Sequence, residues 1–161
     1  MVTIRRIAKG EWELFKQVRL AALKEAPYAF GSTYDRALER TTQSWMDQAD
    51  GSAQGEMRAT FLAFSEDGPV GITALYRNEK DVNEGEVLQV WVAPKTRGTG
   101  LAQRLMATTL AWAEEQGVET ALATISKSNL GAVAFYEKCG FVLVHEQSRD
   151  GDCDLVYEKK I

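Results

Sequence analysis

The chain has 161 residues, a formal net charge of -4 and 45% apolar residues, which is enough to bury one hydrophobic core. The negative charge disfavours general nucleic-acid binding, because that usually requires a basic face. No stretch approaches the roughly 20 apolar residues of a membrane-spanning helix, and the N-terminal residues lack the pattern of a signal peptide. We therefore expect one cytoplasmic domain over residues 1–161, with no nucleic-acid or membrane partner.

Hydrophobic periodicity predicts the elements of the first half of the chain. They are a strand from Val2 to Ile7, a helix from Trp12 that stops at Pro27, a loop from Tyr28 to Ser32, a short helix from Thr42 to Gln48, a hairpin of Thr60 to Phe64 and Val70 to Tyr76, and a strand from Val87 to Val92. Four acidic residues precede this last strand: Glu79, Asp81, Glu84 and Glu86. We expect at least the first three of them to lie in a solvated loop.

The second half continues with a broad apolar helix and further strands. They are a helix from Leu101 to near Gly117, a strand from Ala121 to Ile125, a helix after Asn129, and strands from Phe141 to Glu146 and from Leu155 to Glu158 around the turn at Asp150. The predicted order is βααβββαβαββ, which places the chain in the α/β class.

The cysteines and the histidine give no sign of a metal or redox site. Cys139 and Cys153 fall in different predicted elements, and neither has a His or Cys neighbour at metal-ligand spacing. We therefore expect reduced thiols and no metal. His145, the single histidine, falls in a predicted strand, where a histidine is more often structural than catalytic.

The run from Val92 to Ala102 leaves an apolar strand and enters a helix, and it is typical of a phosphate-binding loop. Gly98 and Gly100 allow backbone N-H groups to converge, and the first N-H groups of the helix lack intrahelical partners, so an anion can bind there. Arg97 adds a positive charge. A dinucleotide fingerprint is excluded by Gln103, and no P-loop motif follows. The alternative interpretation is a glycine-rich surface turn that binds nothing.

A second informative segment follows the strand that begins at Ala121. Asn129 can cap a helix, and Gly140 can end it in the left-handed conformation. Ala132, Phe135 and Cys139 recur on one face of that helix. Taken alone, the segment is an ordinary capped helix.

Together the two segments resemble the two signatures of the GNAT N-acetyltransferases. Arg97-x-x-Gly100-x-Ala102 resembles the family's coenzyme A signature, and Asn129-x-x-Ala132-x-x-Phe135-Tyr136-x-x-x-Gly140-Phe141 is similar to its second signature. The matches occur in the family's order. The resemblance implies the GNAT fold, with a mixed sheet of about seven strands flanked by about four helices.

The resemblance also implies that acetyl-CoA binds as the acyl donor where the fourth and fifth strands separate, its pantetheine arm pairing with the fourth strand. The implied cofactor-binding residues are Val90, Trp91, Val92, Arg97, Gly98, Thr99, Gly100, Leu101, Ala102, Asn129, Ala132 and Tyr136. For the Trp91 ring we expect packing rather than cofactor contact. The alternatives are a fourth strand with ordinary neighbours on both sides and an Asn129 that only caps its helix.

Acetyl transfer to an amine requires a neutral nucleophile, and an alkyl ammonium with a pKa of about 10.4 must first lose a proton. The resemblance implies Glu86 as the general base, directly or through water, and Tyr136 as the proton donor to the leaving thiolate. The alternatives are a solvated Glu86 and a Tyr136 ring that only packs under the pantetheine. Gln89 is a candidate for orienting a water or the substrate.

In the family, the acceptor pocket is built from the first two helices, their loop and the later hairpin. The aromatic residues there are Tyr28, Phe30, Tyr34 and Tyr76, of which we expect about half in the core. The predicted acceptor-binding residues are Phe30, Tyr34, Glu86 and Gln89.

The predicted function is acetyl transfer from acetyl-CoA to a primary amine of a small molecule, amino acid or peptide, by direct attack in a ternary complex. The alternative is a non-catalytic coenzyme A-binding sensor or interaction module, and the presence of both Tyr136 and Glu86 favours the enzyme. Exposed edge strands would allow a homodimer.

Overall fold

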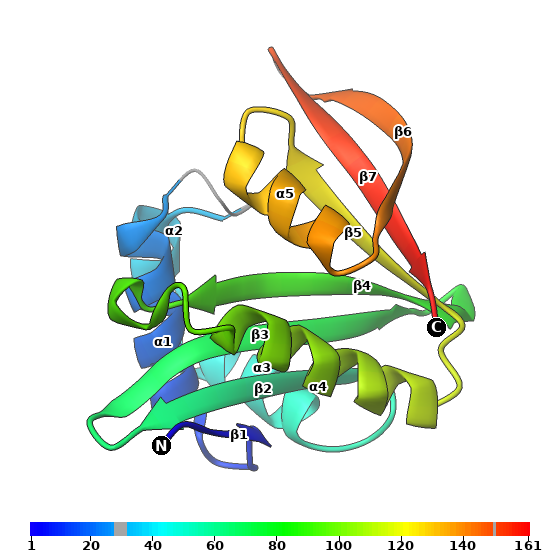
Figure 1. Cartoon of the computed structure of the whole chain (residues 1–161). Coiled ribbons are helices and arrows are strands. Elements are labelled where there is room, and N and C mark those ends of the chain that lie inside the picture. The colour runs from blue at the N-terminus through cyan, green and yellow to red at the C-terminus, as the bar shows by residue number, and fades with distance from the viewer. Residues whose placement is uncertain (28–31, 150) are drawn as a thin grey trace.

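The computed structural model describes residues 1–27, 32–149 and 151–161, and within them seven strands form one mixed sheet (Figure 1). The strands are β1 (Thr3–Arg6), β2 (Arg58–Ser65), β3 (Gly68–Asn78), β4 (Asp81–Val92), β5 (Thr120–Ser126), β6 (Val142–Arg149) and β7 (Asp152–Lys160). Their order across the sheet is β1-β2-β3-β4-β5-β7-β6. Neighbouring strands are antiparallel except β4 and β5, which are parallel and are connected by a helical crossover.

Helices cover both faces of the sheet. They are α1 (Trp12–Glu25), α2 (Tyr34–Leu38), α3 (Thr42–Ala53), α4 (Leu101–Glu115) and α5 (Leu130–Lys138), with a 3-10 turn, η1 (Pro94–Thr96), between β4 and α4. α1 and α3 pack on one face, and α4 and α5 pack on the other. This order and layering confirm the predicted fold class.

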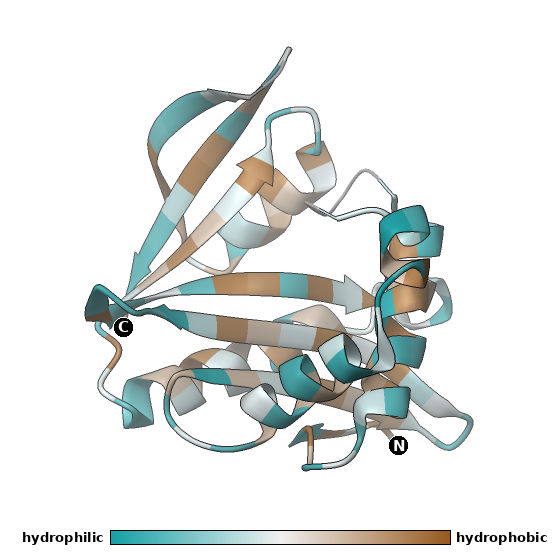
Figure 2. Cartoon of the chain, turned by 180° about the vertical axis from the view of Figure 1, so that it is seen from behind, coloured by the Kyte–Doolittle hydropathy of each residue, from teal (hydrophilic) through white to brown (hydrophobic). Residues whose placement is uncertain are grey.

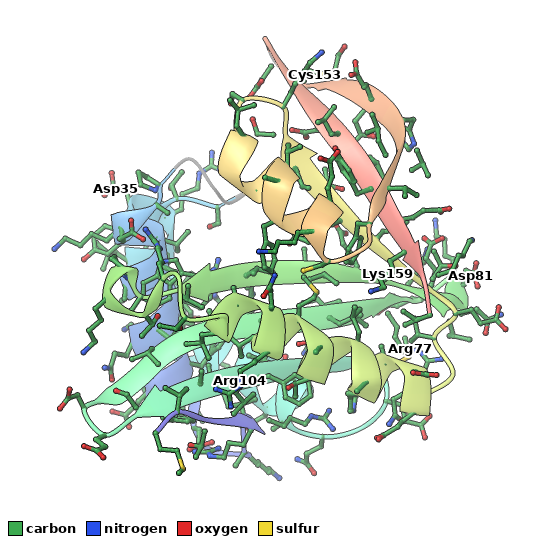
Figure 3. All side chains as sticks on the ribbon, viewed as in Figure 1. Asp35, Arg77, Asp81, Arg104, Cys153 and Lys159 are labelled. Atoms are coloured by element: carbon green, nitrogen blue, oxygen red, sulfur yellow. The ribbon has the colours of Figure 1, made fainter. Side chains whose placement is uncertain are left out.

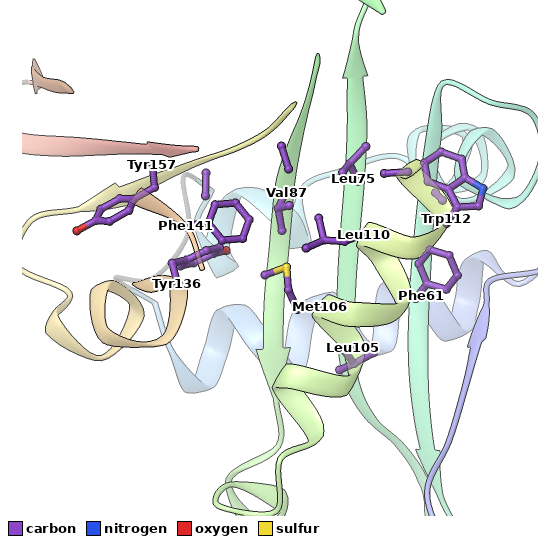
Figure 4. Packing of buried hydrophobic residues seen from close by; sticks show 14 of the residues in the cluster. Phe61, Leu75, Val87, Leu105, Met106, Leu110, Trp112, Tyr136, Phe141 and Tyr157 are labelled. Atoms are coloured by element: carbon purple, nitrogen blue, oxygen red, sulfur yellow. The ribbon is translucent and has the colours of Figure 1, made fainter. Parts of the chain in front are cut away.

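The alternation of side chains along the strands produces two hydrophobic clusters. On β2, Phe61 joins the cluster under α4 and α5, while the next residue, Leu62, joins the cluster under α1 and α3. In Figure 4, Met106 and Leu110 of α4 face Val87 of β4. Figure 2 shows hydrophobic residues along the middle of the central strands and hydrophilic residues in the outer turns. The centre of the sheet is therefore covered by a hydrophobic cluster on each face.

Two helices are predicted between the first and second strands, whereas the structure has three. The additional helix, α2, begins at the cap Thr33, whose hydroxyl accepts a hydrogen bond from the Arg36 amide at 3.2 Å. With five residues it is too short to show helical periodicity. α3 also continues past the predicted end at Gln48 and through Gly51, because Ala49 is fully buried and packing overrides the poor helix propensity of glycine.

The expectation of a solvated loop before the fourth strand is wrong for two of its residues. β4 already begins at Asp81, which pairs with Asn78 of β3, and Glu84 pairs with Thr120 of β5. Glu79 alone lies in the turn. Backbone pairing with strands on both sides outweighs the low strand propensity of acidic residues.

β6 forms one edge of the sheet and carries three consecutive exposed apolar residues, Val142, Leu143 and Val144. Homodimer formation through such an edge stays a prediction. In the described ranges of the chain, no helix is both long enough and apolar enough to span a membrane.

Candidate active site

β4 and β5 pair over a short stretch, from Glu84↔Thr120 to Glu86↔Leu122, and then diverge, as Figure 1 shows. A cavity of about 530 Å³, here called the central cavity, lies beyond the last pair. Its lining residues are Val87 to Val92 of β4, Thr124 and Ile125 of β5, Asn129, Gly131, Ala132, Phe135 and Tyr136 at α5, Glu25 and Ala26 at the C-terminal end of α1, and Arg97 and Ala102 near the start of α4. On the side that faces β5, the β4 backbone beyond Glu86 therefore borders this cavity, while its other side stays paired with β3.

The backbone of β4 is irregular beside the central cavity. The register with β3 skips at Gln89 and Val90, which together stand opposite Thr73. Gln89 has a φ of 60°, which side-chain-bearing residues rarely adopt, and its side-chain oxygen is buried without a hydrogen-bond partner among the described residues. A bulge of this kind takes a residue out of the ladder and changes the direction of neighbouring backbone groups.

The loop between η1 and α4 forms a second cavity, of about 340 Å³, here called the loop cavity. Gly98 and Gly100 have φ values of 80° and 83°, in the left-handed region that favours glycine. Gly100 is the N-cap of α4 and offers no side-chain cap, so the first N-H groups of this helix remain available to an anion. Thr99 lines neither cavity; its hydroxyl donates to the carbonyl of Thr96 at 2.5 Å.

The two cavities, together called the cleft, adjoin each other and share the lining residues Val92, Arg97, Ala102 and Phe135. The remaining residues of the loop cavity are Thr96, Gly98, Gly100, Leu101, Gln103 and Lys138. Arg97 and Lys138 are both basic, so the loop cavity combines positive side chains with a helix N-terminus. This combination suits a phosphate group.

Arg97 lies at the junction of the two cavities and is held by Glu25. Its Nη2 donates to the Glu25 carboxylate and to the carbonyl oxygen of Val92, the latter at 3.2 Å. The same Glu25 oxygen accepts a hydrogen bond from Trp91 Nε1 at 3.0 Å. Burial alone would raise the pKa of Glu25, but the hydrogen bonds from Trp91 and Arg97 outweigh it, so the pKa lies below its ordinary value.

Glu86 occupies the last paired position before β4 and β5 separate, one residue before the lining of the central cavity begins. Partial burial raises the pKa of Glu86, a hydrogen bond from the Thr124 hydroxyl opposes that rise, and the charge of Glu84 adds to it. The outcome is a carboxylate that is more basic than an exposed glutamate.

Tyr136 lines the central cavity from α5 and is buried. Its ring packs edge-to-face on Phe141, with ring centroids 5.3 Å apart, and Figure 4 shows the pair on the side of the core next to Val87. Burial raises the pKa of the Tyr136 phenol, and the charges of Cys139 and Glu86 raise it further. The phenol therefore stays protonated at neutral pH and can donate its hydrogen.

Asn129 both caps α5 and lies on the wall of the central cavity, so its position is compatible with both roles considered for it in the sequence. Its side chain caps α5 by accepting from the Ala132 amide at 3.2 Å, and it also lines the central cavity.

Only some of the residues predicted to bind the acceptor line the cleft. Gln89 lines the central cavity, whereas Tyr34 packs with the α1 and α3 cluster. Tyr76 is engaged by Gln48, whose Nε2 donates to the phenol oxygen at 2.9 Å. Tyr28 and Phe30 lie outside the described residues.

The cleft residues that were not predicted include Glu25, Thr124, Phe135 and Lys138. Phe135 and Lys138 are three apart on α5, so helical spacing could have placed them on one face. Glu25 and Thr124 carry no local signal, because each meets its partner through packing between distant segments.

Both cysteines are free, and Figure 3 shows Cys153 near the turn between β6 and β7, at the opposite end of β7 from Lys159. Across the residues with described positions, no three His, Cys, Asp or Glu side chains gather where they could hold a metal ion.

Comparisons with known proteins agree with this geometry. The chain is 32% identical over 160 residues to mycothiol acetyltransferase of Streptomyces coelicolor, covering 97% of this chain and 45% of that protein. It is 30% identical over 146 residues to aminoglycoside N(6')-acetyltransferase type 1 of Stenotrophomonas maltophilia, covering 86% of this chain and 85% of that one. The crystal structure of a GNAT-family acetyltransferase from Streptococcus pneumoniae superimposes with a TM-score of 0.85 at 19% identity, covering 100% of this chain and 99% of the other.

The chain thus spans about half the length of the mycothiol acetyltransferase, and nearly all of the aminoglycoside enzyme. Residues 18–141 match the model of the acetyltransferase (GNAT) family. This range contains the loop before α4, the diverging strands β4 and β5, and α5. On this match, and on the 30% identity to the aminoglycoside enzyme, the chain belongs to the GNAT acetyltransferase family.

Proposed function

We propose that this protein transfers the acetyl group of acetyl-CoA to a primary amine of a small molecule, amino acid or peptide, by direct attack in a ternary complex. The observation that carries the proposal is the pair of adjoining cavities that lie between the uncapped N-terminus of α4 and Tyr136 and share Arg97. One end of this cleft suits a diphosphate, and the other carries groups suited to acyl transfer.

The residues of the cleft fit coenzyme A. Gly98 has nothing within 4 Å of the position that a Cβ would occupy, and Gly100 has only a side-chain oxygen at 4.0 Å, so no protein atom crowds these two glycines, which both line the loop cavity. Arg97, Lys138 and the first N-H groups of α4 would hold phosphate groups. Backbone of β4 from Val90 to Val92 would pair with the amides of the pantetheine arm. When bound, acetyl-CoA supplies a thioester carbonyl for attack and a thiolate as the leaving group.

Glu86 is the proposed general base. The acceptor arrives as an ammonium and must lose a proton to gain a free electron pair, and a carboxylate with a raised pKa accepts that proton more readily than an ordinary one. Because Glu86 lies just outside the lining of the central cavity, transfer through one water suits its position. Thr124 holds the carboxylate by a hydrogen bond from the neighbouring strand.

Tyr136 is the proposed hydrogen-bond donor to the thiolate. Its raised pKa makes full transfer of the proton to sulfur unfavourable, because a thiol has an ordinary pKa of about 8.5. A hydrogen bond from a buried phenol still stabilises the charge that develops on sulfur. The role assigned to Tyr136 is therefore stabilisation of the leaving thiolate, which takes its proton from solvent water as it leaves the cleft.

The acceptor is proposed to be a primary amine on a polar small molecule. The relative that this chain covers over most of its length is named for acetylation of an aminoglycoside, and the other is named for mycothiol. Aminoglycosides, amino acids and short peptides are therefore the first acceptors to test.

The experiment is calorimetric titration with acetyl-CoA, paired with thiol-release assays over a panel of these amines. We expect micromolar binding and thiol release that depends on an amine. Binding without release on a broad panel would support a non-catalytic coenzyme A-binding module instead. Absence of binding would contradict the assignment of the loop before α4.

A further inference from the structure

The most unusual contact in the cleft joins the two charged side chains that line the central cavity. Of the described residues that line the central cavity, Glu25 and Arg97 are the charged ones. They are paired with each other, so the cavity wall carries no net charge. Arg97 also lines the loop cavity, where the diphosphate is proposed to bind. The guanidinium that would serve the cofactor is therefore engaged by a carboxylate of the same chain.

The ion pair between Glu25 and Arg97 can be broken at little cost in stability. The side chains of Glu25 and Arg97 are 33% and 49% exposed, and exposed ion pairs of this kind contribute little to stability because water competes for both partners. Glu25 keeps a second partner, Trp91 Nε1, which holds the carboxylate in place whether or not Arg97 remains bound. Arg97 retains the Val92 carbonyl and stays beside the cleft.

A diphosphate at the start of α4 would compete with this carboxylate. Both are oxyanions that bind the same guanidinium, and a carboxylate close to the diphosphate repels it. A diphosphate offers more charge, together with the N-H groups of α4, so it can displace Glu25.

We propose that Glu25 is an internal competitor of the coenzyme A diphosphate for Arg97, and that cofactor binding displaces it. This inference rests on the proposed function. Displacement leaves the Glu25 carboxylate on the cavity wall without its guanidinium partner, so the bound cofactor gives the central cavity a negative charge that it otherwise lacks.

The test is calorimetric titration of coenzyme A into the wild type and into Glu25→Gln, which keeps the shape and a hydrogen-bond acceptor for Trp91 but removes the charge. We expect the variant to bind coenzyme A about two- to fivefold more tightly, which is the size of an exposed ion pair, with a smaller gain at high salt. Glu13→Gln, the same change on the first turn of the same helix, is the matched control and should not change the affinity.

Two further measurements assign the effect to the diphosphate and to Arg97. S-acetylpantetheine, which has the thioester arm without the diphosphate, should bind the wild type and Glu25→Gln equally. In an Arg97→Ala background, Glu25→Gln should lose most of its gain. Unchanged or weaker coenzyme A binding by Glu25→Gln, an equal gain for S-acetylpantetheine, or a full gain without Arg97 would each overturn the proposal. Failure of the wild type to bind coenzyme A would instead overturn the proposed function.

Discussion

Glu86 on β4 and Tyr136 on α5 lie close enough for the charge of one to act on the other, across the point where β4 and β5 separate. Burial is the largest cause of the raised pKa of Tyr136, and the charges of Cys139 and Glu86 add to it. A negative charge on Glu86 therefore adds to the effect of burial in favouring the protonated phenol. In the proposed mechanism, Glu86 would act as the base and Tyr136 as the hydrogen-bond donor in aminolysis of the thioester.

Replacement of Tyr136 by Phe removes the hydrogen-bond donor and keeps the ring. We expect kcat to fall by a factor of roughly 100, because stabilisation of the developing thiolate is lost. The affinity for coenzyme A should stay within about twofold, since the packing on Phe141 remains. Steady-state kinetics and calorimetry measure the two quantities.

The matched control for this replacement is Tyr157→Phe. Tyr157 is a buried tyrosine of β7 whose hydroxyl donates to Glu137 at 2.9 Å, and it does not line either cavity. Its loss should leave kcat unchanged. A Tyr136→Phe enzyme with wild-type kcat would contradict the role of the phenol.

Replacement of Thr124 by Val tests the hydrogen bond that the hydroxyl donates to Glu86. This bond stabilises the ionised carboxylate, so its loss should raise the pKa of Glu86 further. The rate falls as pH drops through the pKa of the base, and the acidic limb of the kcat/KM profile should therefore move to higher pH, by about 0.5 to 1 unit.

Two variants check the origin of that shift. Thr124→Ser keeps the hydroxyl and should keep the wild-type profile. Glu86→Gln should lose the acidic limb together with most of the activity, by a factor of roughly 100. An acidic limb that survives in Glu86→Gln would show that another group is the base.

Gly100 is suited to a pair of replacements, Ala and Glu. Both place a Cβ at a φ of 83°, so each should destabilise the fold by about 1 to 2 kcal/mol in denaturant unfolding. Only the Glu variant adds a negative charge at the N-terminus of α4, and it should bind coenzyme A at least about tenfold more weakly than the Ala variant. Equal affinities for the two variants would argue that no phosphate binds at this loop.

Thr73 and Thr109 form a buried pair of hydroxyls, 2.5 Å apart, that joins β3 to α4 opposite the irregular stretch of β4. Thr109 donates its own hydrogen to the carbonyl of Leu105, so Thr73 must donate to Thr109. Thr109→Val removes the acceptor and leaves a buried donor at Thr73, and it should cost about 1 to 3 kcal/mol of unfolding free energy.

The reverse change, Thr73→Val, leaves Thr109 with its bond to Leu105 and should cost less. The double variant should be no less stable than Thr109→Val alone, because no buried hydroxyl is left without a partner. Additive losses in urea unfolding would contradict this arrangement of the two hydrogens.

Much of the fold followed from local patterns. The apolar runs of β2 and β3 and the helical spacing of α4 are properties of adjacent residues, and so is the glycine loop from Gly98 to Gly100. Patterns of this kind show in a sequence because a strand, a helix or a turn constrains residues only a few positions apart. The short helix α2 and the acidic start of β4 escaped prediction because neighbouring elements, more than their own propensities, stabilise them.

The sequence by itself determined the class of the fold, the two motifs, and the candidate residues Glu86, Tyr136 and Arg97. Only the tertiary structure decided what surrounds them. The partners Glu25 and Arg97 are 72 residues apart, and Thr124 reaches Glu86 from another strand. Side-chain pairs of this kind exist only once α1 has packed beside β4 and the sheet has opened between β4 and β5, and no local periodicity encodes such contacts.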